Sequence, residues 1–173
     1  ERGRYGLGHA KDFDKKTKKE LLAMLHVPSS ERQFIMYEAL RKGATVDELF
    51  ELTKIKHYFI QQMKELVEEE ESLMQYKGEV PPVEVLRQAK LDGFADKYLS
   101  ELLGVTEEEI RDARTKEGIV EGWEGVHVSA TPDSAYYFSS YHIKDQSPCS
   151  DNKKIMILGG GPNRIGQGIE FDY

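Results

Sequence analysis

The stretch GATVDEL, Gly43 to Leu49, and its near-copy GVTEEEI, Gly104 to Ile110, decide the fold class of this chain. In each stretch a threonine follows the glycine by two residues and precedes a glutamate by three. Thr-x-x-Glu is a capping box, in which the hydroxyl and the carboxylate bind the first free amides of a helix. A glycine just before it is the usual left-handed stop of a preceding helix. Both stretches therefore predict that one helix ends and another begins.

The likeness between the two stretches has two explanations, and the sequence leaves both open. A helix–Gly–x–Thr–helix turn is common, and base rates favour this explanation. An internal duplication is the alternative, which a single short match cannot establish. Ser30 to Gln33 has the same spacing and predicts a further capping box.

Apolar residues at helical spacing extend the helical prediction from about Thr17 to Gly118. Pro81-Pro82 open one helix that Gly93 ends, and Ala95 to Leu103 form the next. The longest helix is expected between Thr53 and Tyr76. Its predicted apolar stripe consists of Ile55, Phe59, Met63, Leu66 and Leu73.

Four consecutive glutamates, Glu68 to Glu71, interrupt that stripe. We interpret them as the solvated end of the helix. A metal site is disfavoured, because adjacent helical positions face different directions.

The bulk composition excludes several classes of function. The chain has 173 residues, 39% of them hydrophobic and 32% charged, which is typical of a globular protein. A net charge of −7 gives no electrostatic case for binding nucleic acid. The sequence has no apolar run near the roughly 20 residues that cross a membrane. A single cysteine, Cys149, excludes an internal disulfide framework and favours a cytoplasmic location.

The pattern changes from Ile119, where glycines and the aromatic string AYYFSSY replace the helical spacing. This change predicts an extended linker over residues 119–153, docked through Tyr136, Tyr137, Phe138 and Tyr141. The apolar run Ile155 to Leu158 then predicts a strand buried on both faces of a parallel sheet. The other strands of that sheet would come from sequence beyond Tyr173.

The glycine-rich loop after this run matches neither standard phosphate-binding motif. The dinucleotide fingerprint requires a third glycine where Arg164 stands. The P-loop requires Lys and Ser or Thr where Gln167 and Gly168 stand, so the charge for the phosphates and the Mg²⁺ ligand are both missing. On the residues alone, Glu170 and Asp172 are most simply acids in a first helical turn, favoured by the helix dipole.

The whole string IMILGGGPNRIGQGIEFDY resembles the start of the second synthetase half in the carbamoyl-phosphate synthetase large-subunit family. RGRYGLG resembles the end of the first half. VDELFELTKIKHYFIQQMKELVEEE and LRQAKLDGFADKYLSELLGVTEEEIRDAR resemble the oligomerisation domain between the halves. The stretch GVHVSATPDS departs from the family, which has an acidic, cysteine-containing linker there.

The resemblance implies a mainly α fold. An orthogonal helical bundle is followed by an extended linker and by the opening strand of an α/β pre-ATP-grasp subdomain. The implied boundaries are residues 1–16 for the tail of the first half, 17–118 for the oligomerisation domain, 119–153 for the linker and 154–173 for the start of the second half.

The family enzyme makes carbamoyl phosphate from bicarbonate, glutamine-derived ammonia and two ATP. Its ATP and Mg²⁺ (or Mn²⁺) ligands lie outside this stretch, so no catalytic residue, metal ligand or cofactor is expected here, and the chain alone is expected to be inactive. Gly168 and Glu170 match positions that line the carbamate channel, and the glycine-rich loop consists of Gly159, Gly160, Gly161 and Gly166.

The expected partners are the remaining synthetase halves, the small glutaminase subunit and further copies of the same chain, with no nucleic acid and no membrane. The alternative is a small helical regulator of the helix-turn-helix type. It is disfavoured because GVTEEEI would bring three glutamates to the DNA phosphates. A nucleotide-binding oxidoreductase fails on the glycine spacing.

Overall fold

The computed structural model describes residues 4–9, 12–126 and 137–156. These residues are mainly helical, which confirms the predicted mainly α class. The elements are the 3₁₀ turns η1 (Phe13–Lys15) and η2 (Met74–Tyr76), the helices α1 (Lys18–Met24), α2 (Arg32–Arg41), α3 (Val46–Thr53), α4 (His57–Leu73), α5 (Val83–Leu91), α6 (Asp96–Leu103) and α7 (Glu107–Lys116), and the strands β1 (Gly122–Gly125) and β2 (Tyr137–Ser140).

Capping boxes begin three of the helices. The boxes at Thr45 and Thr106 form as predicted, with each threonine hydroxyl accepting from the amide three residues on. Thr17 and Glu20 form a third box at α1, which the sequence analysis missed although the spacing is the same.

The capping box predicted at Ser30 is wrong. Helix α2 begins at Arg32, after Glu31, and no side chain caps it. Ser29 accepts a hydrogen bond from the Glu31 amide at 3.3 Å instead. The Glu31 carboxylate is held by the Arg4 guanidinium at 2.5 Å, so this helix start is fixed by a distant residue.

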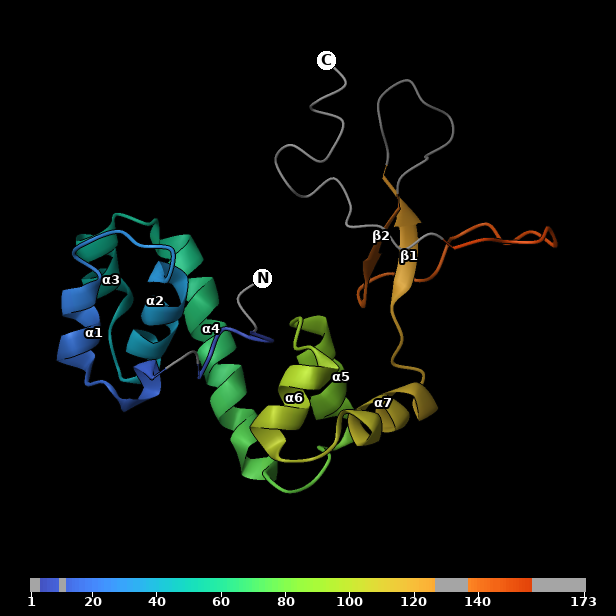
Figure 1. Ribbon diagram of the computed structural model, residues 1–173, viewed down its shortest axis with the longest axis horizontal. Helices are drawn as coiled ribbons and strands as arrows, with labels where there is room; N and C mark the ends of the chain where they lie inside the picture. The colour runs from blue at the N-terminus through green and yellow to red at the C-terminus, as the bar shows by residue number, and fades with distance from the viewer. Residues whose placement is uncertain (1–3, 10–11, 127–136, 157–173) are drawn as a thin grey trace, which may run out of the picture.

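The helices form two units that repeat with an offset of fifty residues. The first unit is α2–α3–α4 and the second is α5–α6–α7. Helices α2 and α5 end at Arg41 and Leu91, and α4 and α7 begin at His57 and Glu107. The middle helices, α3 and α6, have equal lengths and the same offset at both ends. Figure 1 shows α1, α2 and α3 on one side of the long helix α4 and α5, α6 and α7 on the other.

Burial follows the same offset. Five equivalent pairs of apolar residues are buried in both units: Met36 and Leu86, Ala39 and Ala89, Ala44 and Phe94, Leu49 and Leu99, and Ile60 and Ile110. The turn between the first two helices is also shared, because Gly43 and Gly93 have φ angles of 83° and 89°. A structural repeat therefore exists, but its register is not that of GATVDEL and GVTEEEI. The counterpart of Gly104 is Lys54, which also has a left-handed backbone.

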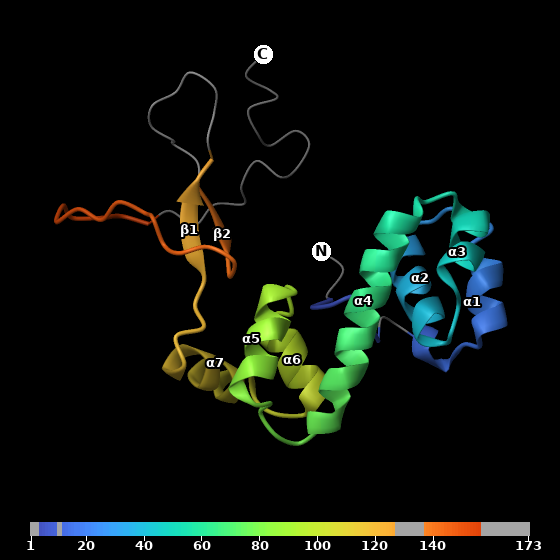
Figure 2. The ribbon, with the colours of Figure 1, turned by 180° about the vertical axis from the view of Figure 1, so that it is seen from behind.

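Each unit has its own apolar core, and α4 contributes to both. Leu21, Leu49 and Ile60 belong to the first core, while Leu73 joins the second. Leu66 packs against both cores. The view from behind shows α4 running between α1–α3 and α5–α7 (Figure 2). The two units are thus joined by a shared helix rather than by a free linker.

The apolar stripe of α4 differs from the prediction. Ile60, Val67, Glu70 and Leu73 are its buried residues, whereas Phe59 is 61% exposed. The prediction that Glu68 to Glu71 form a solvated helix end is wrong for Glu70, whose side chain is fully buried. The cause is the helical period: position 70 follows Ile60 and Val67 on the same face.

In the predicted linker the structure has a two-stranded antiparallel sheet, in which Trp123 pairs with Ser139 and Glu124 with Phe138. The sequence analysis missed this sheet. Tyr141 packs against the second core as expected, but Tyr137 and Phe138 are exposed. In the predicted strand Ile155–Leu158, Ile155 and Met156 belong to no strand and are 90% and 83% exposed. Residues 157 and 158, like Tyr136, lie outside the described residues.

Candidate functional site

All six site residues named from the sequence lie outside the described part of the structure. They are Gly159, Gly160, Gly161, Gly166, Gly168 and Glu170. Their roles remain predictions. Within the described residues, the polar chemistry concentrates in two buried ionic clusters, one for each helical unit.

The first cluster surrounds Glu70 on α4. Its carboxylate accepts from the Arg41 guanidinium of α2 at 2.5 Å and from the Tyr37 hydroxyl at 2.6 Å. The Tyr37 hydroxyl also lies 3.1 Å from the Leu66 carbonyl oxygen. Burial alone would raise the pKa of Glu70. The hydrogen bonds from His9 and Tyr37 and the charge of Arg41 outweigh burial and lower that pKa to about 2. Glu70 is therefore ionised inside the protein.

Other groups complete this cluster. Arg41 also pairs with Glu38, whose Oε1 lies 3.1 Å from its Nε, and with Glu71. His9 Nε2 lies 3.3 Å from Glu70 Oε1. That contact raises the pKa of His9, because Glu70 stabilises the protonated ring. Three carboxylates thus surround one guanidinium, and the His9 ring contacts one of them.

The second cluster joins α5, α6 and α7. Asp96 accepts from Lys90 Nζ at 2.6 Å and from Arg114 Nε at 2.7 Å. Lys90 Nζ also donates to the Phe94 carbonyl oxygen at 2.6 Å. The Tyr141 ring lies over this cluster, 4.9 Å from Lys90 Nζ and 5.7 Å from the Arg114 guanidinium carbon. Cation–π contacts of this kind hold the linker against the second unit.

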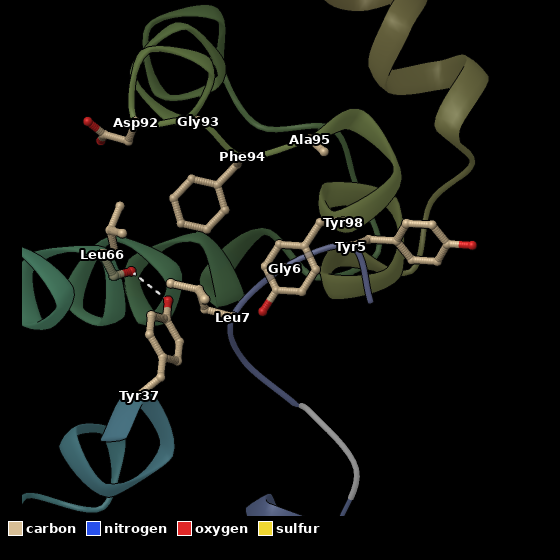
Figure 3. Close-up of a pocket in the computed structure, with 10 residues that line it drawn as sticks. All are labelled: Tyr5, Gly6, Leu7, Tyr37, Leu66, Asp92, Gly93, Phe94, Ala95 and Tyr98. Atoms are coloured by element: carbon tan, nitrogen blue, oxygen red, sulfur yellow. Dashed lines mark hydrogen bonds between the residues drawn. The ribbon is translucent and has the colours of Figure 1, made fainter. Parts of the chain in front are cut away.

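A small cavity of about 100 Å³ lies where the two units meet (Figure 3). Tyr37 and Leu66 line it from the first unit, and Phe94 and Tyr98 from the second. The N-terminal segment, residues 5–7, forms the remaining wall. The cavity thus lies between the two units, with residues 5–7 along one wall.

An apolar surface lies at the start of α4. Tyr58 and Phe59 are 67% and 61% exposed, and their rings meet edge to face at a centroid distance of 5.4 Å. Beside them, Met36, Ile55 and Met63 help to line a groove of about 350 Å³ between α2 and α4. Two adjacent exposed aromatics beside an apolar groove are typical of a surface that another protein covers.

The described residues hold no group of three His, Cys, Asp or Glu side chains placed to bind a metal ion. None of the helices in the described ranges is long and apolar enough to cross a bilayer. What the described part of the chain presents is therefore packing, ion pairing and an exposed apolar surface.

Sequence reasoning missed Glu70, Lys90 and Asp96. For Glu70 a signal existed: it continues the spacing of Ile60, Met63 and Val67. For Lys90 and Asp96 no local signal existed, because charged residues at these positions are ordinarily exposed.

Comparison with known proteins identifies the family. A model described as the carbamoyl-phosphate synthetase large chain, oligomerisation domain, matches residues 1–118. The chain belongs to the carbamoyl-phosphate synthetase large-chain family. A second model of that family, the preATP-grasp domain, matches residues 151–173. The resemblance inferred from the sequence is thereby confirmed.

Named relatives agree along nearly the whole chain. The carbamoyl phosphate synthase large chain of Archaeoglobus fulgidus is 42% identical over 99% of this chain, and that of Myxococcus xanthus is 41% identical over all of it. An arginine-specific chloroplastic large chain of Arabidopsis thaliana is 41% identical over 89%. The matched region is only 16%, 16% and 13% of those proteins' own lengths. The helix-turn-helix regulator is not favoured, and the first turn of α7 is acidic.

Proposed function

We propose that this chain acts within a carbamoyl-phosphate synthetase large chain, where it connects the two synthetase halves and mediates association between copies. The whole enzyme would make carbamoyl phosphate from bicarbonate, glutamine-derived ammonia and two ATP. The observation that carries the proposal is the match of residues 1–118 to the oligomerisation domain of that family. The exposed apolar surface of Tyr58 and Phe59 supports it, because such a surface gains free energy when it is covered.

Several finer features belong to the same proposal. The helices would pack as an orthogonal bundle, and residues 154–173 would open a pre-ATP-grasp subdomain. ATP and Mg²⁺ would bind elsewhere in the large chain, a small glutaminase subunit would supply ammonia, and the enzyme would be cytoplasmic. The chain alone would be catalytically inactive.

The association step can be tested on the chain as it stands. We expect sedimentation equilibrium over a concentration series to show reversible self-association. The double variant Tyr58→Glu/Phe59→Glu should remain monomeric, because two carboxylates replace the apolar contact. Gln75→Glu adds a charge at an exposed position away from this surface and should associate normally. A wild-type chain that stays monomeric at every concentration would count against the association role.

The catalytic context is tested in the complete enzyme. Gly168→Leu would place a large side chain where the family resemblance puts the carbamate channel. We expect partial reactions that hydrolyse ATP to continue while carbamoyl phosphate formation falls. Unchanged coupling between the two would contradict the channel role of Gly168 and leave the association result unaffected.

A further inference from the structure

The segment of residues 4–9, which we call the strap, crosses the molecule where the two helical units meet. Arg4 pairs with Glu31 at 2.5 Å, and its guanidinium carbon lies 3.8 Å from the centre of the Phe34 ring of α2. Farther along the strap, Lys97 Nζ of α6 lies 5.6 Å from the centre of the Tyr5 ring. The strap therefore contacts the first helix of one unit and the middle helix of the other.

Two glycines allow the strap to approach the helices closely. A Cβ on Gly6 would lie 2.6 Å from carbon atoms of the Tyr98 ring. A Cβ on Gly8 would lie 2.6 Å from both the Glu70 carboxylate and the Tyr98 hydroxyl oxygen, and would also collide with Arg41. Neither glycine has a positive φ. Both glycines leave room for these side chains rather than supply a special backbone conformation, so the strap lies in close contact with the helices.

The strap also ends on the buried charges. His9 adopts a left-handed φ of 52°, uncommon for a residue other than glycine. This turn brings its ring to Glu70. Glu70 in turn binds Arg41 and Tyr37 of the first unit. The strap thus places the His9 imidazole against a buried carboxylate, with His9 Nε2 3.3 Å from Glu70 Oε1.

Beneath the strap lies the cavity shared by the two units. In Figure 3 the strap residues Tyr5, Gly6 and Leu7 run past Tyr98 on one side and Tyr37 on the other. Since residues from both units form the opposite walls, removal of the strap would open this space into a groove between them.

We propose that the strap is a latch: it fills the groove between the two helical units and fixes their relative position. Helix α4 joins the units at one side only, and the latch closes the junction by contacting α2, α4 and α6. Any chain that precedes the strap is then coupled to the orientation of both units at once. This inference concerns the described residues alone and does not depend on the proposed function.

The test compares distances between the units in the full 173-residue chain. Cysteines for spin labels replace the exposed Glu51 of α3 and Glu108 of α7, in a background with Cys149→Ser. We expect one narrow distance distribution in the parent chain. In Gly8→Ala the distribution should broaden, while amide exchange in the helix interiors stays as slow as in the parent chain.

Two further variants separate latching from general stability. A chain lacking residues 1–9 should show the same broad distance distribution. Because this variant lacks the methyl group that Gly8→Ala adds, the broadening would then be due to loss of the strap. Gly78→Ala strains a left-handed backbone with φ of 96°, in open space between η2 and α5, so it should lower stability and keep the distribution narrow.

Two results would overturn the latch. One is a distance distribution that stays as narrow in the chain lacking residues 1–9 as in the parent chain. The other is accelerated amide exchange in the helix interiors of Gly8→Ala, which would make Gly8 a general support of the core.

Discussion

The two helical units place their helices alike but fill one pair of positions with opposite chemistry. In the first unit these positions hold Leu40, which is buried, and Val46, which packs against the same core. Fifty residues later they hold Lys90 and Asp96, a buried ion pair with an N–O distance of 2.6 Å. The repeat therefore keeps the same buried positions and the same backbone path in both units. It does not keep the chemistry at these positions, which can be an apolar pair or an ion pair provided that the two side chains are complementary.

The largest effect is expected at the other buried charge, Glu70. Glu70→Gln removes the carboxylate that Arg41 contacts, and losing one partner of a buried pair costs about 3–5 kcal/mol. Urea unfolding followed by circular dichroism measures this loss. Glu68→Gln is the control, since Glu68 is exposed and its pair with Lys64 spans 3.4 Å on the surface. A loss below about 1 kcal/mol, the range of surface pairs, would show that Glu70 is dispensable.

The next prediction exchanges the chemistry between the units. Asp96→Val alone leaves Lys90 and Arg114 without their shared carboxylate and should cost about 3 kcal/mol. Lys90→Leu/Asp96→Val installs the apolar pair of the first unit. It should be more stable than Asp96→Val alone by about 1 kcal/mol or more, because the buried lysine is gone.

Arg114 limits how complete this rescue can be. It still lies 3.7 Å from Glu121 and donates to the Ile119 carbonyl oxygen at 3.1 Å. If the double variant is no more stable than Asp96→Val by urea unfolding, the two units are not interchangeable at these positions.

Lowering the pH should reduce the stabilisation that the ionised Glu70 carboxylate gives to the fold. The folded pKa of Glu70, about 2, is below the unfolded value of about 4.3. A depressed carboxylate pKa stabilises the fold above the unfolded pKa, and this contribution is lost as the pH falls toward the folded pKa. The difference in free energy of unfolding between wild type and Glu70→Gln should therefore decrease as the pH falls from 5 toward 2. Denaturant midpoints measured at each pH would record this decrease. A constant gap would mean that Glu70 is not ionised in the fold.

The smallest effect is expected at the equivalent helix stops. Gly104 has φ of 73° and Lys54 has φ of 58°. A side chain in this conformation costs about 1 kcal/mol relative to glycine. Gly104→Ala should lower the midpoint of thermal unfolding and Lys54→Gly should raise it slightly. The gain is reduced by loss of the exposed Lys54–Glu51 pair. Opposite signs in the two units would confirm that the stops are equivalent.

The sequence was most informative where local chemistry decides the structure. Thr45 and Thr106 each begin a helix by accepting a hydrogen bond from the amide three residues on. Gly43 and Gly93 each end a helix by adopting a left-handed backbone. These features depend on neighbours in the chain, so they can be inferred without the fold.

The sequence was least informative where distant residues decide. Glu31 precedes α2 without a side-chain cap, and its carboxylate pairs with Arg4, 27 residues away. The short strands β1 and β2 carry too few residues to show alternation. The run of four glutamates suggested solvent, but Arg41 and Tyr37 bury one of them. The one similar pair of turns, at Gly43 and Gly104, does not belong to the repeat, whose register is given by matched helix bounds and burial. The candidate channel residues, Gly168 and Glu170, remain predictions.

The strap has a consequence for the order of folding. Arg4 to His9 are the earliest of the described residues to leave the ribosome. Their contact with Tyr98 must wait until some ninety further residues have been made. Each helical unit can form from contacts that are short-range in the chain, whereas strap docking closes a long loop, whose entropy cost grows with loop length. Among the described residues the strap is thus made first, yet it is among the last to find its place, because its contact with α6 requires that helix to have been made.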